Sequence, residues 1–171
     1  MTIQYIPDLI GEVVAKVNTT FSTRPTNPFQ VYYDFGHHEE IIRNMKFKDE
    51  APSKPLKYPL IWLVTPFQES IHSMGLYATA TLHLVIANDT NNVYSMPERR
   101  DKIFLPILYP IWAELMKQLQ NSKRFQISGI PEHEKMDLQY AKVTEGKNLF
   151  NEYVDVIDIT KLKLVVHNKN C

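Results

Sequence analysis

The chain has 171 residues, of which 44% are hydrophobic, 11% aromatic and 22% charged, and these values exclude disordered, collagen-like and coiled-coil proteins. The 19 Lys and Arg residues balance 19 Asp and Glu residues, so the formal net charge is +0, which disfavours nucleic-acid binding because a basic surplus is usual there. The one cysteine is Cys171, and we therefore expect neither a disulfide framework nor a thiolate metal cluster within the chain.

The beginning of the chain has the pattern of an amphipathic helix. Apolar residues recur at steps of three and four between Ile6 and Phe21, and Asp8 lies near the positive end of that stretch. The spacing predicts a helix over residues 7–19. Because charged residues interrupt every apolar run, we expect no secretory segment and no membrane span, but one soluble domain over residues 1–171.

Strands and a long loop are predicted next. Alternation over residues 29–35, and more weakly over residues 41–47, favours two strands. Residues 49–59 contain three prolines and no apolar period, which is typical of an exposed arm or long loop. Compact domains seldom carry such a stretch without use, so we expect this arm to contact another molecule.

Two strands of different character are predicted in the middle of the chain. Residues 60–64 are a continuous apolar run, typical of a strand that is covered on both faces. Residues 76–86 alternate between an aliphatic face and a mixed face that carries His83. The turn formers at residues 88–92 end this second strand.

A long helix follows. Ser95 and Glu98 fit a capping box, in which the two side chains satisfy early backbone N–H groups, and apolar residues then keep helical spacing for about two dozen residues. Pro106 and Pro110 each remove a backbone donor and, being four apart, affect nearly the same face. We therefore predict a bent helix or two helices that meet at an angle.

The end of the chain alternates again, over residues 138–143, 153–159 and 162–166. Strands joined by hairpin-length turns around one or two helices indicate an α+β fold. We expect a largely antiparallel sheet packed against one long bent helix, with an N-terminal helix and an extended arm.

The sequence holds no recognisable catalytic motif. Of the six histidines only His37 and His38 are adjacent, no zinc-site spacing occurs, and the five glycines are too dispersed for the common nucleotide-binding loops. We expect no cofactor and no metal, and we interpret His83 as a packed or surface imidazole. An enzyme is disfavoured; the weakest alternative is a hydrolase assembled from dispersed residues such as His83, Asp89 and Glu98.

Two pairs of like charges have specific interpretations. Asp155 and Asp158 are three apart in a predicted strand, which sends them to opposite faces and prevents a close acid/base pair. Arg99 and Arg100 lie in the first turn of the long helix, where a cation is mildly unfavourable. Either neighbouring acidic residues compensate them, or they face the carboxylates of a partner.

Aromatic side chains exceed what one small core readily covers. Tyr and Trp are enriched at protein interfaces, where they bury much area with few torsions to freeze. Together with zero net charge and the proline-rich arm, this composition favours a subunit of an assembly. The main alternative is a small cellular ligand-binding α+β module whose aromatic residues line a pocket.

Four segments resemble a known class of proteins: YPLIWL (58–63), LVIANDT (84–90), ERRDKIFLPILYPI (98–111) and FNEYVDVIDI (150–159). With the order of the predicted elements, they make most of the chain similar to the head-to-tail connector proteins of tailed bacteriophages. The similarity is to the tail-terminator and tail-completion class, in the form found in phages and prophages of Bacteroidetes. This resemblance implies no enzymatic activity.

The resemblance implies a structural virion protein, made in the host cytoplasm, that forms a ring of six or twelve copies at the phage neck or tail. Its neighbours would be portal, adaptor or tail proteins, DNA would at most pass through the lumen, and no membrane is involved. For such a lumen we expect an acidic or neutral lining. The arm at residues 49–59 would reach a neighbouring subunit or the next ring. The candidate interface residues are Tyr32, Lys54, Lys57, Trp62, Arg99, Arg100, Lys123 and Arg124.

Overall fold

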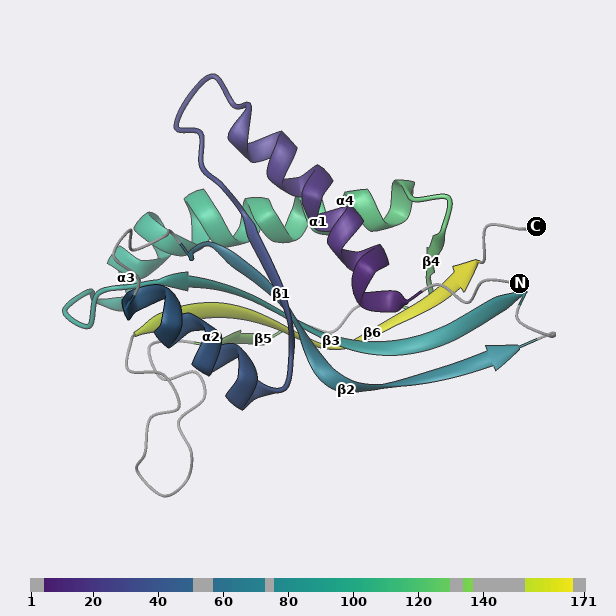
Figure 1. Ribbon diagram of the computed structural model, residues 1–171. Helices are drawn as coiled ribbons and strands as arrows, with labels where there is room; N and C mark the ends of the chain where they lie inside the picture. Colours follow the sequence, from purple (N-terminus) through teal and green to yellow (C-terminus); the bar gives the residue numbers. More distant parts are fainter. Residues whose placement is uncertain (1–4, 51–56, 73–75, 130–133, 137–152, 168–171) are drawn as a thin grey trace.

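The computed structural model describes residues 5–50, 57–72, 76–129, 134–136 and 153–167 (Figure 1). Along the chain the elements are α1 (Ile6–Ser22), β1 (Tyr32–Gly36), α2 (His38–Glu50), β2 (Leu60–His72), β3 (Tyr77–Asp89), α3 (Met96–Arg99), the π-helical segment η2 (Arg100–Leu108), α4 (Tyr109–Asn121), β4 (Phe125–Ile127), β5 (Glu134–Met136) and β6 (Val154–His167). Helices combined with one mostly antiparallel sheet make this an α+β fold, as predicted.

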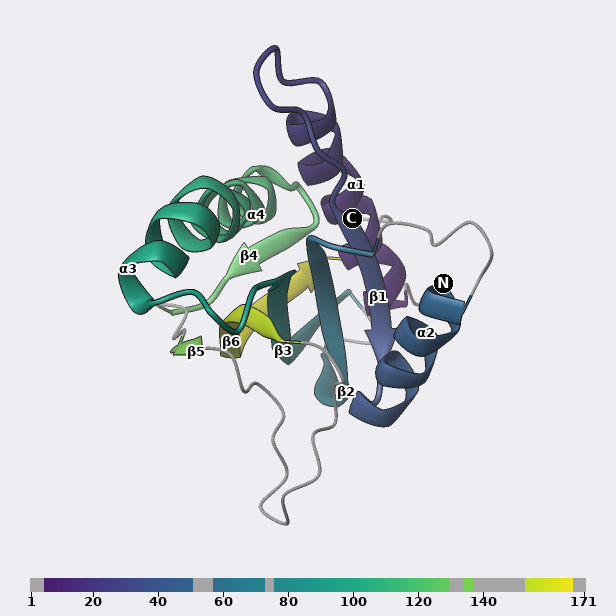
Figure 2. The same cartoon turned by 90° about the vertical axis from the view of Figure 1, so that its left-hand side faces the viewer.

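The described strands form one sheet in the order β1-β2-β3-β6-β4, with β5 also paired to β6. β1 runs parallel to β2, and the other pairs are antiparallel. The three central strands have 13 or 14 residues and curve strongly, whereas the strands beside them have only three to five (Figures 1 and 2). The central strands therefore extend past their short neighbours.

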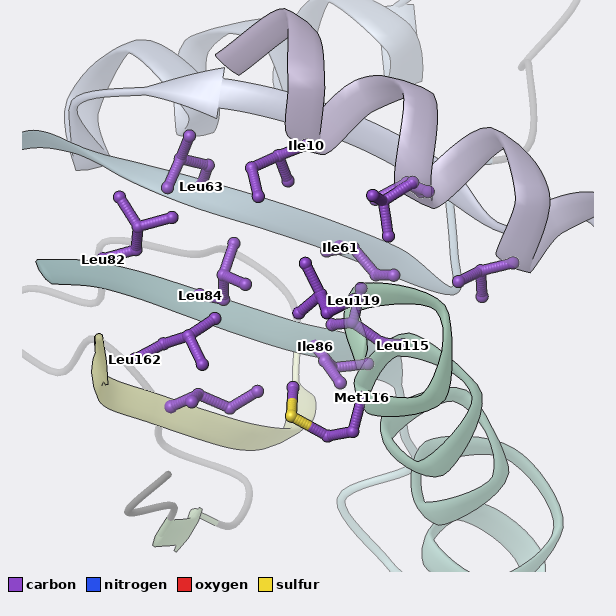
Figure 3. Packing of buried hydrophobic residues seen from close by; sticks show 14 of the residues in the cluster. Ile10, Ile61, Leu63, Leu82, Leu84, Ile86, Leu115, Met116, Leu119 and Leu162 are labelled. Atoms are coloured by element: carbon purple, nitrogen blue, oxygen red, sulfur yellow. The ribbon is translucent and has the colours of Figure 1, made fainter. Parts of the chain in front are cut away.

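One face of the sheet packs against α1 and α4 and holds the main core (Figure 3). On β3 the predicted aliphatic face is confirmed for its buried residues Ala78, Ala80, Leu82, Leu84 and Ile86. Leu76, the first residue of the predicted face, lies before β3 and is 45% exposed. Leu115 and Leu119 of α4 and Ile10 of α1 meet them from the helix layer. Full burial of each such Leu or Ile contributes about 1.5–3 kcal/mol to folding.

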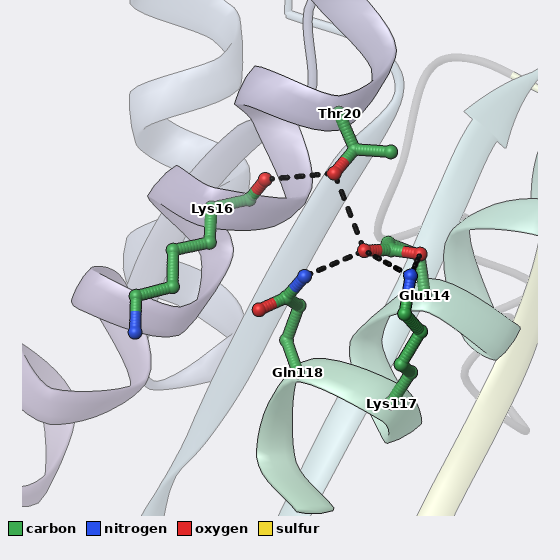
Figure 4. A network of polar contacts seen from close by, with 5 residues as sticks. All are labelled: Lys16, Thr20, Glu114, Lys117 and Gln118. Atoms are coloured by element: carbon green, nitrogen blue, oxygen red, sulfur yellow. Dashed lines mark hydrogen bonds and ion pairs between the residues drawn. The ribbon is translucent and has the colours of Figure 1, made fainter. Parts of the chain in front are cut away.

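A carboxylate joins the two helices of this layer (Figure 4). Glu114 of α4 accepts hydrogen bonds from Thr20 of α1 at 3.2 Å, from Gln118 at 2.6 Å and from Lys117 at 3.1 Å. Burial works against ionisation of Glu114, but the hydrogen bonds from Gln118 and Lys117 outweigh it and keep its pKa below the usual value. The charged form of Glu114 thus helps to hold α1 against α4.

The opposite face of the sheet is covered over part of its length by α2. Ile41 and Met45 of this helix are buried against Trp62, Val85 and Val156. Residues 60–64 therefore have core on both faces, as their continuous apolar run predicted.

The long helix is disrupted at the prolines by a change of helix type. Residues 100–108 form a π-helix that contains Pro106, and α4, with Pro110 as its second residue, continues directly from it. The capping box is present at the start: Glu98 accepts hydrogen bonds from the backbone N–H and the hydroxyl of Ser95, both at 2.9 Å.

Two strand predictions need correction. Residues 41–47 belong to α2 and not to a strand: the spacing of four between Ile41 and Met45 fits either element, and Glu39 and Glu40 favour a helix because they lie in its first turn. The strands predicted over 153–159 and 162–166 are one strand, β6, with a register irregularity opposite His83.

Two further predictions concern segments that lie partly or wholly outside the described residues. The strand predicted over residues 138–143 lies outside the described residues. Of the arm predicted over residues 49–59, Asp49 and Glu50 belong to the end of α2, residues 51–56 lie outside the described part, and Lys57 and Tyr58 lead into β2.

Candidate functional site

At the β2–β3 hairpin, one face of the sheet is left uncovered by the described helices. On the face that α2 covers elsewhere, the hairpin end presents Gln68 and Ser70 from β2 and Thr79 and Thr81 from β3, all exposed or half-buried. Lys163 of β6 lies in the same row as Thr81. Strand alternation produces this arrangement, since Ala78 and its alternate neighbours point into the core.

These side chains line a hollow of about 280 Å³ on the sheet. We call its lining the polar sheet surface; its residues are Gln68, Ser70, Thr79, Ala80, Thr81, Ser128, Lys163, Leu164 and Val165. Hydroxyl and amide groups dominate it, and Lys163 is its single charged member. A surface of this kind offers many hydrogen bonds but little net electrostatic attraction for a polyanion.

An ionisable cluster lies at the boundary between the α2-covered half and the polar sheet surface. His83 Nε2 is 2.5 Å from Asp158 Oδ1, and the His38 ring stands edge-on to Trp62 with centroids 4.8 Å apart. The centroids of the His38 and His83 rings are 6.2 Å apart. Burial lowers the pKa of His38, and His83 and His37 lower it further, whereas Asp158 acts in the opposite direction.

The residues of the hydrolase alternative are not brought together. His83 pairs with Asp158, while Glu98 is bound to Ser95 and Lys102 at the start of the long helix. Asp89 lies at the far end of β3, exposed and six residues beyond His83. Among the described residues, no group of three or more His, Cys, Asp and Glu side chains is arranged to hold a metal ion.

The two aspartates of β6 lie on opposite faces, as predicted. Asp158 points to the α2 side and meets His83, whereas Asp155 points to the long helix and pairs with Arg99. Each carboxylate therefore has a different partner, and the two do not form an acid/base pair.

Two of the predicted interface residues are wrong. Trp62 and Arg99 are each only 1% exposed. Trp62 is packed between α2 and the sheet because residues 60–64 have core on both faces, and its indole N–H donates to the carbonyl of Gly36 at 3.4 Å. Arg99 is buried because Asp155 binds it from β6. The cation of Arg99 is thus compensated inside the fold and does not face a partner.

The other predicted interface residues lie in separate places. Tyr32 and Lys57 are half-buried near the start of β2, and Arg100 is exposed beside Asp101 at 2.8 Å. Lys123 is exposed just before β4, where Arg124 lies 3.2 Å from Glu12. Lys54 lies outside the described residues. The structure does not gather these side chains into one patch.

The polar sheet surface was missed by the sequence analysis. The sequence pattern that could have revealed it is the alternation of polar Gln68 and Ser70 with apolar Phe67 and Ile71. This alternation extends the strand predicted at residues 60–64 as far as His72. Pro66 interrupts this pattern, yet proline is compatible with a strand at the edge of a sheet.

A second hollow of about 420 Å³ lies at the other end of β3. Its lining combines amide, carboxylate and aromatic side chains: Asn88, Asp89, Thr90, Asn91, Asn92, Tyr94, Ile103 and Tyr153. Within the described part of the chain, this hollow corresponds to the aromatic pocket of the ligand-binding alternative.

Comparison with known proteins identifies no family. No protein-family model matches the chain, and a search of the curated proteins finds no significant match. None of the described helices combines the length and apolar character required to cross a membrane.

Proposed function

We propose that this protein is a structural subunit that assembles with copies of itself into a ring at the neck or tail of a tailed bacteriophage and joins the portal side to the tail. The proposal includes its location in the virion and its contacts with portal, adaptor or tail proteins. It assigns the chain no catalytic activity. The resemblance of four segments to head-to-tail connector proteins is its starting point.

The proposal is supported mainly by the hairpin end of the sheet, where the described helices leave one face uncovered. Three long strands continue beyond β1, so the hairpin end of the sheet has a polar face and exposed apolar side chains at its rim. Ile71 and Leu76 are 52% and 45% exposed there. A strand edge without a paired neighbour, beside exposed apolar side chains, is a liability for a monomer, and contact with another chain removes that liability.

The composition of the polar sheet surface suits a channel for DNA. The lining is mostly uncharged, but Lys163 gives it one cation per subunit and not the acidic or fully neutral character expected for a lumen. One cation per subunit still offers few of the phosphate contacts that make DNA binding strong. A lumen lined in this way would let a duplex slide without being held. The formal net charge of +0 also lets neighbouring subunits approach without strong mutual repulsion.

The experiment is a determination of molar mass in solution. The purified full-length chain is passed through a sizing column with light-scattering detection over a range of protein concentrations. We expect a species whose mass is a fixed multiple of the chain mass and whose multiple does not grow with concentration, because a closed ring adds no further copies. A monomer at every concentration would contradict self-assembly.

A second candidate function has one observation in its favour. The hollow beside Tyr94 and Tyr153 has the amide and aromatic groups with which a small-molecule module would bind a polar ligand. This alternative predicts a monomer or dimer in the same sizing experiment. It also predicts that Tyr94→Ala lowers affinity for such a ligand, whereas a ring subunit should tolerate this substitution.

A further inference from the structure

The first relevant feature is the unpaired edge of β2. β1 pairs with β2 only over Leu60–Val64, because it ends at Gly36 and the chain turns into α2. β2 continues to His72 and pairs with β3 on its inner side from Gln68 onward. On the outer side of Gln68–His72, no described residue is paired. Pro66, which has no N–H to donate, lies where this edge begins.

The second feature is the opposite edge of the sheet. β4 has three residues and pairs with Leu164–Val166 of β6 on its inner side. Beyond β4, the described part of the chain supplies no further strand. The described sheet thus has an open edge on each side at the hairpin end.

The two open edges lie at the same level across the sheet. Ser70 pairs with Thr79, Thr79 with Val165, and Val165 with Gln126. Ser70 and Gln126 are therefore the two ends of one row, and both are exposed. A copy placed beside the first in the same orientation would bring its Gln126 next to Ser70 without any shift along the strands.

The strand directions also match. β2 is antiparallel to β3, β3 to β6, and β6 to β4, so β4 runs opposite to β2. The β2 edge of one copy and the β4 edge of the next would therefore form an ordinary antiparallel pair. Each edge supplies the N–H and C=O groups that the other lacks.

The side chains on these edges agree with such a junction. On the polar face, Ser70 would lie beside Gln126, and both can form hydrogen bonds. In the next row, Ile71 pairs with Ala78, Ala78 with Val166 and Val166 with Phe125. Ile71, which is 52% exposed, would thus lie beside Phe125 of the neighbouring copy, the apolar residue at the other end of the row. Like side chains meet on both faces, and pairs of this kind stabilise antiparallel sheets.

We infer that neighbouring copies join by antiparallel pairing of β2 residues 68–72 of one subunit with β4 residues 125–127 of the next. This inference rests on the proposed function and specifies its contact surface. The contact is head-to-tail, since two different edges meet, and rotation from copy to copy closes the ring. Closure pairs the two open edges at the hairpin end of each copy, and the polar sheet surfaces become one continuous lining.

Disulfide cross-linking tests this junction. Ser70→Cys and Gln126→Cys are combined in a Cys171→Ser background, because facing residues on paired strands lie within disulfide distance. Strands in a closed sheet are staggered, so a second variant carries Ser128→Cys in place of Gln126→Cys and detects a shift of two residues. The matched control combines Ser70→Cys with Gln120→Cys, an exposed residue of α4.

We expect a ladder of covalent oligomers, ending at the ring size, from at least one of the two β2–β4 pairs and only monomer from the control. Either single cysteine alone should give no ladder, because a head-to-tail contact brings two different residues together. Rings in the sizing experiment without a ladder from either pair would overturn the junction and leave the proposed function standing. A chain that is monomeric and gives no ladder overturns both.

A second pair of variants separates loss of assembly from loss of folding. Ile71→Lys places a charge on the β2 edge, and Leu105→Lys places one at a similarly exposed apolar position, 54% exposed, on the long helix. Both variants should keep the melting temperature of the monomeric fold. We expect Ile71→Lys to lose the ring species while Leu105→Lys retains it. An intact ring in Ile71→Lys would contradict the junction.

Discussion

Arg99 and Asp155 form a two-pronged ion pair inside the fold. Arg99 Nε donates to Asp155 Oδ2 at 3.1 Å, and the Nη2 group contacts Oδ1. The two side chains are 1% and 0% exposed. The pair joins the start of the long helix to β6 across 56 residues of sequence, so it fixes where the helix lies on the sheet.

The first prediction concerns removal of one member of this pair. Asp155→Ala leaves the guanidinium of Arg99 buried without its carboxylate, and we expect it to lower the free energy of unfolding by about 3–5 kcal/mol. Chemical denaturation measures this change. Arg100→Ala, at the exposed pair with Asp101, is the matched control and should change stability little. Equal effects of the two substitutions would contradict the buried pair.

The second prediction concerns the core beneath α1 and α4. Leu84 is fully buried at the centre of the sheet, so Leu84→Ala creates a cavity and should cost about 2–5 kcal/mol of unfolding free energy. Leu105→Ala removes the same atoms from a side chain that is 54% exposed and should cost far less. The account of the core is wrong if denaturation places the two variants at similar midpoints.

The third prediction concerns His38 and pH. Its pKa in the folded chain lies below the usual 6.5, so the unfolded chain binds a proton that the folded chain does not. Neutral His38 contributes fully to the free energy of unfolding above pH 6.5, the pKa of histidine in the unfolded chain. This contribution is lost as the pH falls from 6.5 toward the lower pKa of the folded chain. Denaturation at about pH 7.5 and about pH 5.5 measures the loss.

His38→Phe should reduce this pH dependence, since phenylalanine keeps an aromatic ring beside Trp62 but cannot be protonated. The His83–Asp158 pair remains in this variant, so the difference from the unmodified chain reports His38 itself. An unchanged slope of stability against pH would show that the imidazole of His38 is not held neutral by its surroundings.

Most of the fold could be predicted from the sequence because each of its strongest hydrophobic patterns is compatible with only one kind of secondary structure. The alternation on β3 and the continuous apolar run at residues 60–64 correspond to the two ways in which this sheet is buried. Residues 41–47 were misassigned because a spacing of four fits a helix and a strand equally well. The prolines predicted a disruption of the long helix, but not its π-helical form.

The polar sheet surface was harder to predict than the fold, because the register between strands decides which side chains lie side by side on it. A row that contains Ser70, Thr79, Val165 and Gln126 draws on four strands, and no local pattern sets their alignment. Arg99 was expected either beside local carboxylates or at a partner, whereas its real partner is 56 residues away. Trp62 was predicted at an interface because tryptophan is common there. In the structure its side chain belongs to the second core, between α2 and the sheet.

The fourth prediction concerns acid stability and the contact between α1 and α4. The pKa of Glu114 lies below its usual 4.5 in the folded chain, so its contribution is present above that value and is lost as the pH falls below it. Glu114→Gln should therefore flatten the decline in unfolding free energy between about pH 5 and about pH 3. Glu39→Gln, at an exposed position of α2, is the matched control for the loss of one carboxylate. An equal decline in the unmodified chain and in Glu114→Gln would contradict the role of this carboxylate.

The most direct measurement is electron microscopy of phage particles labelled with antibody against this chain. If the protein is a ring subunit of the neck or tail, the label lies at one site per particle, on the neck or tail, and the purified chain forms rings of uniform diameter on the same grids. Label absent from every particle, together with purified protein that shows no rings, would contradict the assignment.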